Sequence, residues 1–103
     1  MTKIVRLSSG EEIICTVESG ESSVTLHEPA VIIPVGQGEI GLAPWLVYAN
    51  TKEGVTIDNK FVVFVVDPED EFRTNYEQGF VPRMKGIVTP EKKLVMPSLK
   101  LAD

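Results

Sequence analysis

The chain holds one cysteine and one histidine, Cys15 and His27, a pair that could serve as a nucleophile and its base. A lone free cysteine is more often a small buried hydrophobic residue, so we favour a structural role for Cys15. Two such residues are also too few for zinc, which usually takes three or four protein ligands. We therefore predict that the protein binds no metal and no cofactor.

Other catalytic arrangements are missing from the sequence. The glycines Gly36, Gly38 and Gly41 are not followed by a helix pattern, so they indicate a hairpin turn and not a phosphate-binding loop. No carboxylate pair or nucleophile–base spacing appears elsewhere. We predict that the protein is not an enzyme.

The composition is that of one globular domain, with 103 residues of which 43% are hydrophobic and 24% charged. No signal peptide precedes the first strand pattern, and no apolar run approaches the roughly 20 residues that span a bilayer. Together with the single cysteine, this predicts a cytoplasmic protein without membrane contact. The net charge of −5 counts against nucleic acid as a default ligand, because basic residues supply most of that affinity.

Alternating apolar residues and turn signals predict extended stretches at residues 5–7, 13–17, 24–33, 39–49 and 55–57. The first two are joined by the turn Ser8-Ser9-Gly10 and should form a hairpin. Pro29 interrupts the third stretch, where a bend, a bulge or a sheet edge is expected because proline donates no hydrogen bond.

The last strand, Phe61–Val66, is apolar without alternation, which predicts burial on both faces. A second copy of the chain is the simplest cover; the alternative is that the helix or the tail covers the strand. Burying about 500 Å² of apolar surface in this way would contribute roughly 12 kcal/mol before association costs. The residues predicted at such an interface are Phe61, Val63, Phe64, Val65, Trp45 and Val47.

A helix is predicted over residues 68–80, with Asp67 as N-cap, Pro68 at the first helical position and Gly79 near its end. Three aromatic residues at i, i+4 and i+8 form a narrow apolar stripe on it: Phe72, Tyr76 and Phe80. The remaining residues, 81–103, contain three prolines and are predicted to form an extended, partly ordered C-terminal tail, in which residues 92–96 could be a short strand or a docking segment.

Two segments carry a resemblance to a known family. The spacing Val5-x-Leu7-x-x-Gly10-x-x-Ile13-x-Cys15-x-Val17 resembles the first Sm motif, and residues 55–65 resemble the second. The segments Leu42-Ala43-Pro44-Trp45 and Val65–Phe72 look like those of the small Sm-like (LSm) proteins that tailed phages of the cyanophage type encode; a phage protein of this kind would act in the host cytoplasm.

The resemblance implies a mainly β fold: a five-stranded, strongly bent antiparallel sheet, or small open barrel, with a C-terminal helix. It assigns residues 1–80 to this domain, with strands within 3–66. It also implies a homo-oligomeric ring, in which the fourth strand of one copy pairs with the fifth strand of the next. Phe61–Val66 stands at the fifth position, and ring closure would remove exposed edges.

The sequence departs from the family where RNA-binding members contact RNA. The loop Ser19–Ser23 lacks their aromatic and Asn residues, and Asp58-Asn59-Lys60 replaces their Arg-Gly-Asn or Arg-Gly-Asp. Loss of base stacking removes about 1–3 kcal/mol per base. The family's helix before the first strand is also absent, and Cys15 replaces the glycine of strongest curvature.

Two functions remain open at this point. The first is a ring that binds single-stranded RNA as a regulator or chaperone, with Asp58, Asn59 and Lys60 at the contact. The second is a protein-interaction or structural ring without RNA binding, favoured by the acidic balance and the replaced loop residues. In both, the main partner is a further copy of the chain.

Overall fold

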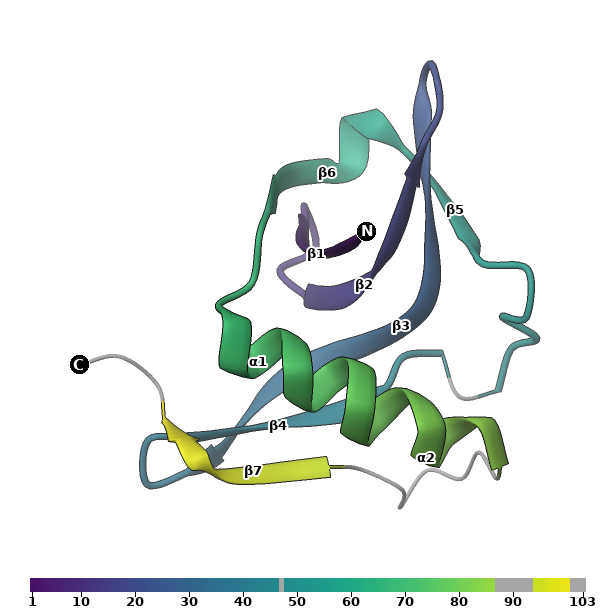
Figure 1. Cartoon of the computed structure of the whole chain (residues 1–103). Coiled ribbons are helices and arrows are strands. Elements are labelled where there is room, and N and C mark those ends of the chain that lie inside the picture. The colour runs from purple at the N-terminus through teal and green to yellow at the C-terminus, as the bar shows by residue number, and fades with distance from the viewer. Residues whose placement is uncertain (47, 87–93, 101–103) are drawn as a thin grey trace.

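The computed structural model describes residues 1–46, 48–86 and 94–100, the segments 84–86 and 94–100 through their backbone alone. The chain forms one bent antiparallel sheet followed by a helix (Figure 1). The strands are β1 (Thr2–Leu7), β2 (Glu12–Ser19), β3 (Ser23–Gly36), β4 (Glu39–Pro44), β5 (Val55–Asp58), β6 (Val62–Val66) and β7 (Leu94–Lys100). The helical segments are the 3₁₀ turn η1 (Asn59–Phe61) and a continuous helix made of α1 (Asp70–Asn75), the π turn η2 (Tyr76–Phe80) and α2 (Val81–Gly86).

The strand order is β6-β1-β2-β3-β4-β7, so the sheet does not close and ends at β6 and at β7. One edge of β3 carries β2; the other carries β5 at residues 23–26 and β4 at residues 30–36. The predicted class, a mainly β bent antiparallel sheet with a C-terminal helix, is confirmed. The sheet has seven strands where five were expected, because residues 55–58 form a strand of their own on β3 and residues 94–100 add a strand to β4.

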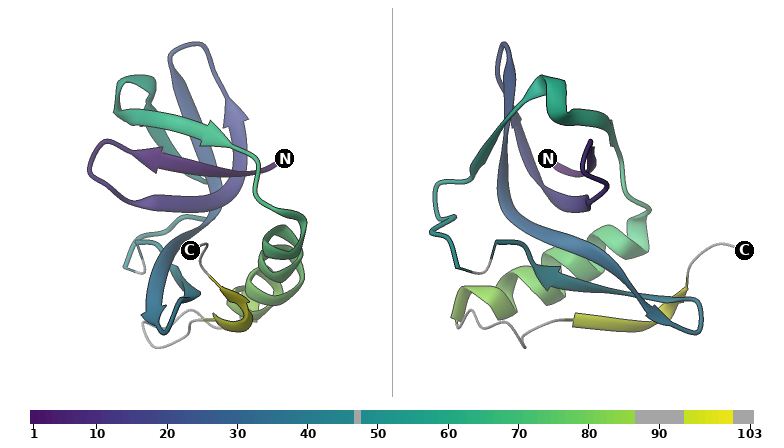
Figure 2. Two further views of the ribbon diagram at one scale, coloured as in Figure 1. Left: turned by 90° about the vertical axis from the view of Figure 1, so that its left-hand side faces the viewer. Right: turned by 180° about the vertical axis from the view of Figure 1, so that it is seen from behind.

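A bulge between β2 and β3 produces the bend of the sheet. Ile14 pairs with Ala30 and Thr16 with His27, so the single residue Cys15 faces two residues, Glu28 and Pro29. Glu28 has a φ of 54°, a left-handed conformation that is uncommon outside glycine. The irregularity predicted at Pro29 is confirmed, and β3 changes direction along its length (Figure 2).

The backbone carbonyl groups of Glu28 and Pro29, the two bulged residues of β3, bind other parts of the chain. The Tyr76 hydroxyl donates to the Glu28 carbonyl oxygen at 2.6 Å. The Trp45 amide donates to the Pro29 carbonyl oxygen at 3.3 Å. The bulge therefore fixes both the helix and the segment that follows β4.

The core lies on both faces of β2. The barrel cluster fills the bent sheet and consists of Val5, Leu7, Ile13, Cys15, Val24 and Leu26. The helix cluster lies between the sheet and the helix and consists of Ile14, Ala30, Ile40, Leu42, Phe72, Tyr76 and Phe80. Because consecutive strand residues point to opposite faces, the buried run Ile13-Ile14-Cys15 supplies both clusters.

The predicted aromatic stripe of the helix is confirmed, since Phe72, Tyr76 and Phe80 are all buried. In a regular α-helix, residues four apart drift by about 40° around the axis. The wider π turn between Tyr76 and Phe80 offsets that drift. It leaves their rings stacked, with centroids 5.9 Å apart and planes 16° apart.

Several element boundaries differ from the predictions. The last strand begins at Val62, because Phe61 belongs to the 3₁₀ turn η1. The helix begins at Asp70 with Glu69 as its cap, because the Asp67 carboxylate bonds the Lys3 ammonium and does not cap. The helix continues through Gly79 to Gly86, because Phe80 is buried in the helix cluster. Residues 81–86 are therefore helical and do not belong to an extended tail.

The fourth stretch, expected to reach Ala49, ends at Pro44. Leu46 then turns the chain with a φ of 57°, and the segment returns to the sheet at Gly54. A Cβ on Gly54 would lie 2.5 Å from Thr25 Cγ2 and 3.0 Å from the His27 ring. The return of the chain to β3 therefore requires glycine at this position.

The substitution Tyr76→Phe should lower the free energy of unfolding by about 1–2 kcal/mol, because it leaves the Glu28 carbonyl without its buried donor. Urea unfolding followed by circular dichroism measures the change. Tyr48→Phe is the matched control, since Tyr48 is 94% exposed and should tolerate the same loss. Equal stability of the two variants would contradict a role for the bulge carbonyl in holding the helix.

Candidate functional site

The strand β6 carries the main exposed apolar surface among the described residues. Its inner edge pairs with β1, where Val65 lies opposite Val5 and Phe64 opposite Arg6, and its outer edge is an end of the sheet. Four of its residues and their neighbour in η1, which we call the β6 patch, are exposed by 38–58%: Phe61, Val63, Phe64, Val65 and Val66. Valine and phenylalanine favour strands, which explains why this run extends along β1.

Both faces of β6 are open. Phe64, Val65 and Val66 are consecutive and point alternately to the two sides of the sheet, yet each is exposed. Val62 alone packs partly against the barrel cluster. The helix directs its aromatic stripe at the helix cluster, and β7 lies at the other end of the sheet. As far as the structure describes them, neither the helix nor β7 covers the strand as the alternative prediction required; the tail residues 87–93 and 101–103 lie outside the described residues.

The residues expected to contact RNA stabilise a turn. The Asp58 carboxylate accepts a hydrogen bond from the Lys60 amide at 2.9 Å and so caps η1. The Asn59 amide donates to the Ser22 carbonyl oxygen at 2.9 Å, which ties η1 to the loop between β2 and β3. The Lys60 ammonium lies 5.2 Å from the centre of the Phe61 ring. These contacts fix the start of β6.

The interface residues predicted from the sequence fall into two places. Phe61, Val63, Phe64 and Val65 come together in the β6 patch, which also includes Val66; the unalternating run already contained the signal for that residue. Trp45 follows β4, which three strands separate from β6 in the strand order, and it packs partly against the barrel cluster. Val47 lies outside the described residues.

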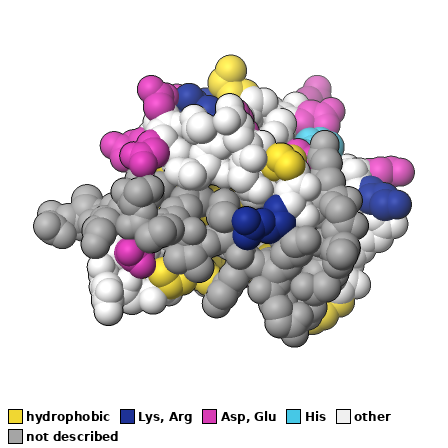
Figure 3. All heavy atoms as spheres, turned by 60° about the horizontal axis from the view of Figure 1, so that its bottom comes forward, with side chains coloured by type: hydrophobic (Ala, Val, Ile, Leu, Met, Phe, Trp, Pro, Cys, Tyr) yellow, Lys and Arg dark blue, Asp and Glu magenta, His cyan; other side chains and the backbone are white. Residues whose placement is uncertain are grey.

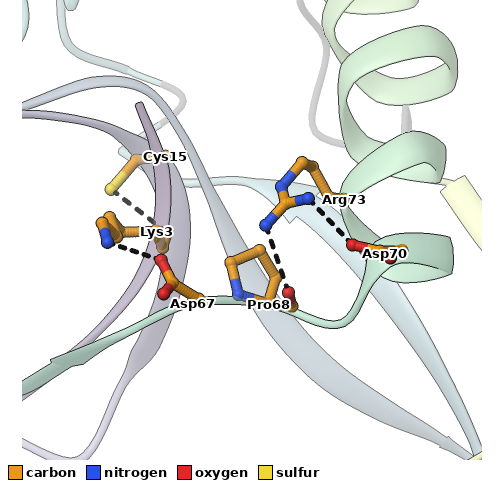
Figure 4. A network of polar contacts seen from close by, with 6 residues as sticks. All are labelled: Lys3, Cys15, Asp67, Pro68, Asp70 and Arg73. Atoms are coloured by element: carbon orange, nitrogen blue, oxygen red, sulfur yellow. Dashed lines mark hydrogen bonds and ion pairs between the residues drawn. The ribbon is translucent and has the colours of Figure 1, made fainter.

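A polar network fixes the other end of β6, where the chain passes into the helix (Figure 4). The Lys3 ammonium binds the Asp67 carboxylate at 2.5 Å. This hydrogen bond, with the charge of Lys3, lowers the pKa of Asp67. Arg73 donates to the Pro68 carbonyl oxygen at 3.5 Å and to the Asp70 carboxylate at 3.0 Å. The patch strand is thus held at both ends by contacts within the chain.

Cys15 and His27 occupy different environments. Cys15 is fully buried in the barrel cluster, and its thiol lies 4.0 Å from the Lys3 carbonyl oxygen. His27 is partly exposed, and its Nε2 lies 2.9 Å from the Glu18 carboxylate. Among the residues that the structure describes, no group of three or more His, Cys, Asp and Glu side chains could hold a metal ion. No helix in the same part of the chain is long and apolar enough to cross a membrane.

The comparisons with known proteins add no relative. No protein-family model matches the chain, and no curated protein matches it. The function is therefore argued from the geometry of the β6 patch and its surroundings.

The Cys15 thiol should be unreactive in the folded protein. Burial raises its pKa from 9.0 to about 12, and the nearby amino terminus lowers it by a smaller amount. We expect no reaction with Ellman's reagent at pH 8 until guanidinium unfolds the chain, because the thiolate is the reactive form. Rapid labelling of the native protein would contradict this burial.

The same shift predicts a loss of stability in base. Below about pH 8.5 both states keep the proton, so Cys15 adds no pH dependence. At higher pH the unfolded thiol ionises and the folded one does not, so the free energy of unfolding falls by about 1.4 kcal/mol per pH unit. Cys15→Ala should flatten this slope between pH 9 and 10. Above pH 10 the buried Tyr76, whose pKa is also raised by burial, should add a second loss.

Proposed function

We propose that the protein is a non-catalytic self-assembly module whose β6 edge binds a strand of a second copy of the chain. The observation that carries the proposal is the β6 patch, an apolar strand exposed on both faces at an end of the sheet. Exposed apolar surface of this kind is typical of an interaction site, and an open strand edge supplies unpaired backbone donors and acceptors.

The patch also lacks the charges and prolines that often protect an edge. Proteins that stay monomeric place lysine, proline or an inward charge on such strands. Residues 61–66 contain neither a charge nor a proline. The one irregularity is a bulge at Val63, where Val62 pairs with Leu7 and Phe64 with Arg6. The edge is therefore better suited to pairing than to exposure.

The resemblance to Sm-like proteins supports the same proposal. By its place in the strand order, β6 corresponds to the fifth strand of that family, and β4 with β5 corresponds to the interrupted fourth strand, since both lie on one edge of β3. Pairing of β6 with the neighbour's fourth strand would join copies head to tail. A head-to-tail contact closes into a ring when its rotation allows.

Phe64→Asp tests the assembly. Phe64 is 38% exposed in the single chain, so the charge is tolerated by the monomer but would be buried in the contact. We expect the wild-type protein to be oligomeric by light scattering at micromolar concentration, and the variant to require at least about tenfold more protein to associate. A strictly monomeric wild type would overturn the proposal.

Tyr48→Asp is the matched control for this experiment. It places the same charge on a residue that is 94% exposed and lies outside the β6 patch, in the segment between β4 and β5. Its assembly should equal that of the wild type. Circular dichroism of both variants checks that the sheet is retained.

Single-stranded RNA binding, the other function that the resemblance implies, has less geometric support. Asp58, Asn59 and Lys60 all contribute contacts to the turn at η1. On the face in Figure 3, the described Lys and Arg side chains form no continuous patch, and acidic side chains lie near them. A phosphate backbone would find little complementary charge on that face.

We expect labelled oligo-U and oligo-A not to bind at low salt, as measured by fluorescence anisotropy at two salt concentrations. The Lys60→Ala variant provides the control. Binding by the wild type that weakens with salt and is reduced by Lys60→Ala would favour the RNA function instead.

A further inference from the structure

The end of the sheet opposite β6 is covered by the chain itself. The strand β7 lies alongside β4, as Figure 1 shows, and pairs with it in antiparallel orientation. The edge of β4 that a neighbouring strand would need is therefore occupied in the single chain. No such cover lies on β6 among the described residues.

The hold of β7 on β4 is short and irregular. Leu94, Val95 and Met96 pair in order with Leu42, Gly41 and Ile40. The next pair is Lys100 with Glu39, so residues 97–99 have no partner across the strand. Pro97 falls in this break and cannot donate to a ladder.

The β6 strand is a stronger candidate for the same edge. It offers five consecutive apolar residues without proline, and β4 presents six residues, of which β7 pairs with four. Addition of a strand to the outer edge of β7 is less favourable, because Pro97 and the break in register interrupt the row of hydrogen-bonding groups on that edge.

We propose that β7 is an intramolecular cap, which competes with β6 of a second copy for the edge of β4. This inference rests on the proposed function and names the regulation of the same contact. The cap keeps the chain dissociated when it is dilute, and assembly requires that β7 be released.

Competition of this kind sets a concentration threshold. A strand tethered to its own domain acts at an effective concentration in the millimolar range, so a free copy at micromolar concentration displaces β7 only through a stronger contact with β4, such as the proline-free β6 offers. The apparent dissociation constant of the assembly is raised by the fraction of chains whose β4 edge is capped. Whatever holds β7 in place should weaken assembly, and whatever releases it should strengthen assembly.

A reversible disulfide can lock the cap in the full-length protein. Glu39 and Lys100 are directly opposite each other, and opposite residues of antiparallel strands have Cα atoms about 4.5–5.5 Å apart. That separation suits a disulfide. The variant Glu39→Cys/Lys100→Cys, oxidised with diamide, should need at least about tenfold more protein to associate than the same sample after reduction with dithiothreitol. Cys15 can stay, because it is buried.

The two single-cysteine variants are the controls for oxidation. Non-reducing electrophoresis should show the oxidised double variant as a single chain. Disulfide-linked multimers would show β7 paired with another copy's β4 and would overturn an intramolecular cap. Equal association of the oxidised and reduced forms would overturn the inference and leave the proposed function intact.

Leu94→Pro provides the opposite change. Because the Trp45 amide donates to the Pro29 carbonyl, the alternation of the ladder directs the backbone groups of Gly41 at β3 and those of Leu42 at β7, where Leu94 is the partner. Proline at position 94 therefore removes a donor to β4. It should lower the concentration needed for assembly by about tenfold, whereas Leu94→Ala, which keeps the donor, should change it little. If the wild type is strictly monomeric at micromolar concentration, the proposed function fails and this inference fails with it.

Discussion

The bulge at Cys15, Glu28 and Pro29 is the constraint on which the rest of the structure depends. It bends β3, so that the first half of this strand pairs with β5 and the second half pairs with β4. At the bulge, the Glu28 carbonyl binds the Tyr76 hydroxyl and the Pro29 carbonyl binds the Trp45 amide. A local break in pairing thus gives the small sheet its curvature, its helix and the position of the segment after β4.

Features with a local physical cause were predictable from the sequence. Pro29 lacks a donor and indicated the irregularity, and the spacing of Phe72, Tyr76 and Phe80 indicated the buried face of the helix. For the helix, the wrong predictions concerned its two ends, which contacts with residues distant in the sequence determine. Asp67 is a good N-cap by type, but Lys3 from β1 binds its carboxylate, and burial of Phe80 carries the helix past Gly79. Such contacts join residues that are remote along the chain, so spacing does not encode them.

For the candidate site, the exposed strand β6 was predicted from the sequence and the pairing of β7 with β4 was not. The unalternating run 61–66 predicted a strand that its own chain would leave uncovered, and the exposed side chains of β6 agree with that. Residues 92–96 indicated a short strand or a docking segment, but the sequence did not predict that residues 94–100 would lie on β4. This pairing depends on the edge that the fold creates, and that edge exists only once β3 and β4 have formed.

The contacts at the two ends of β6 have a consequence for the thermodynamics of association. The Asp58 cap at η1 fixes the start of the strand, and the Lys3–Asp67 ion pair fixes its end. The backbone of β6 is therefore already ordered before any partner arrives. Little conformational entropy remains for it to lose on binding, so the entropy loss of complex formation falls mainly on the incoming chain. In the proposed assembly the exposed strand would be a rigid template for the incoming chain.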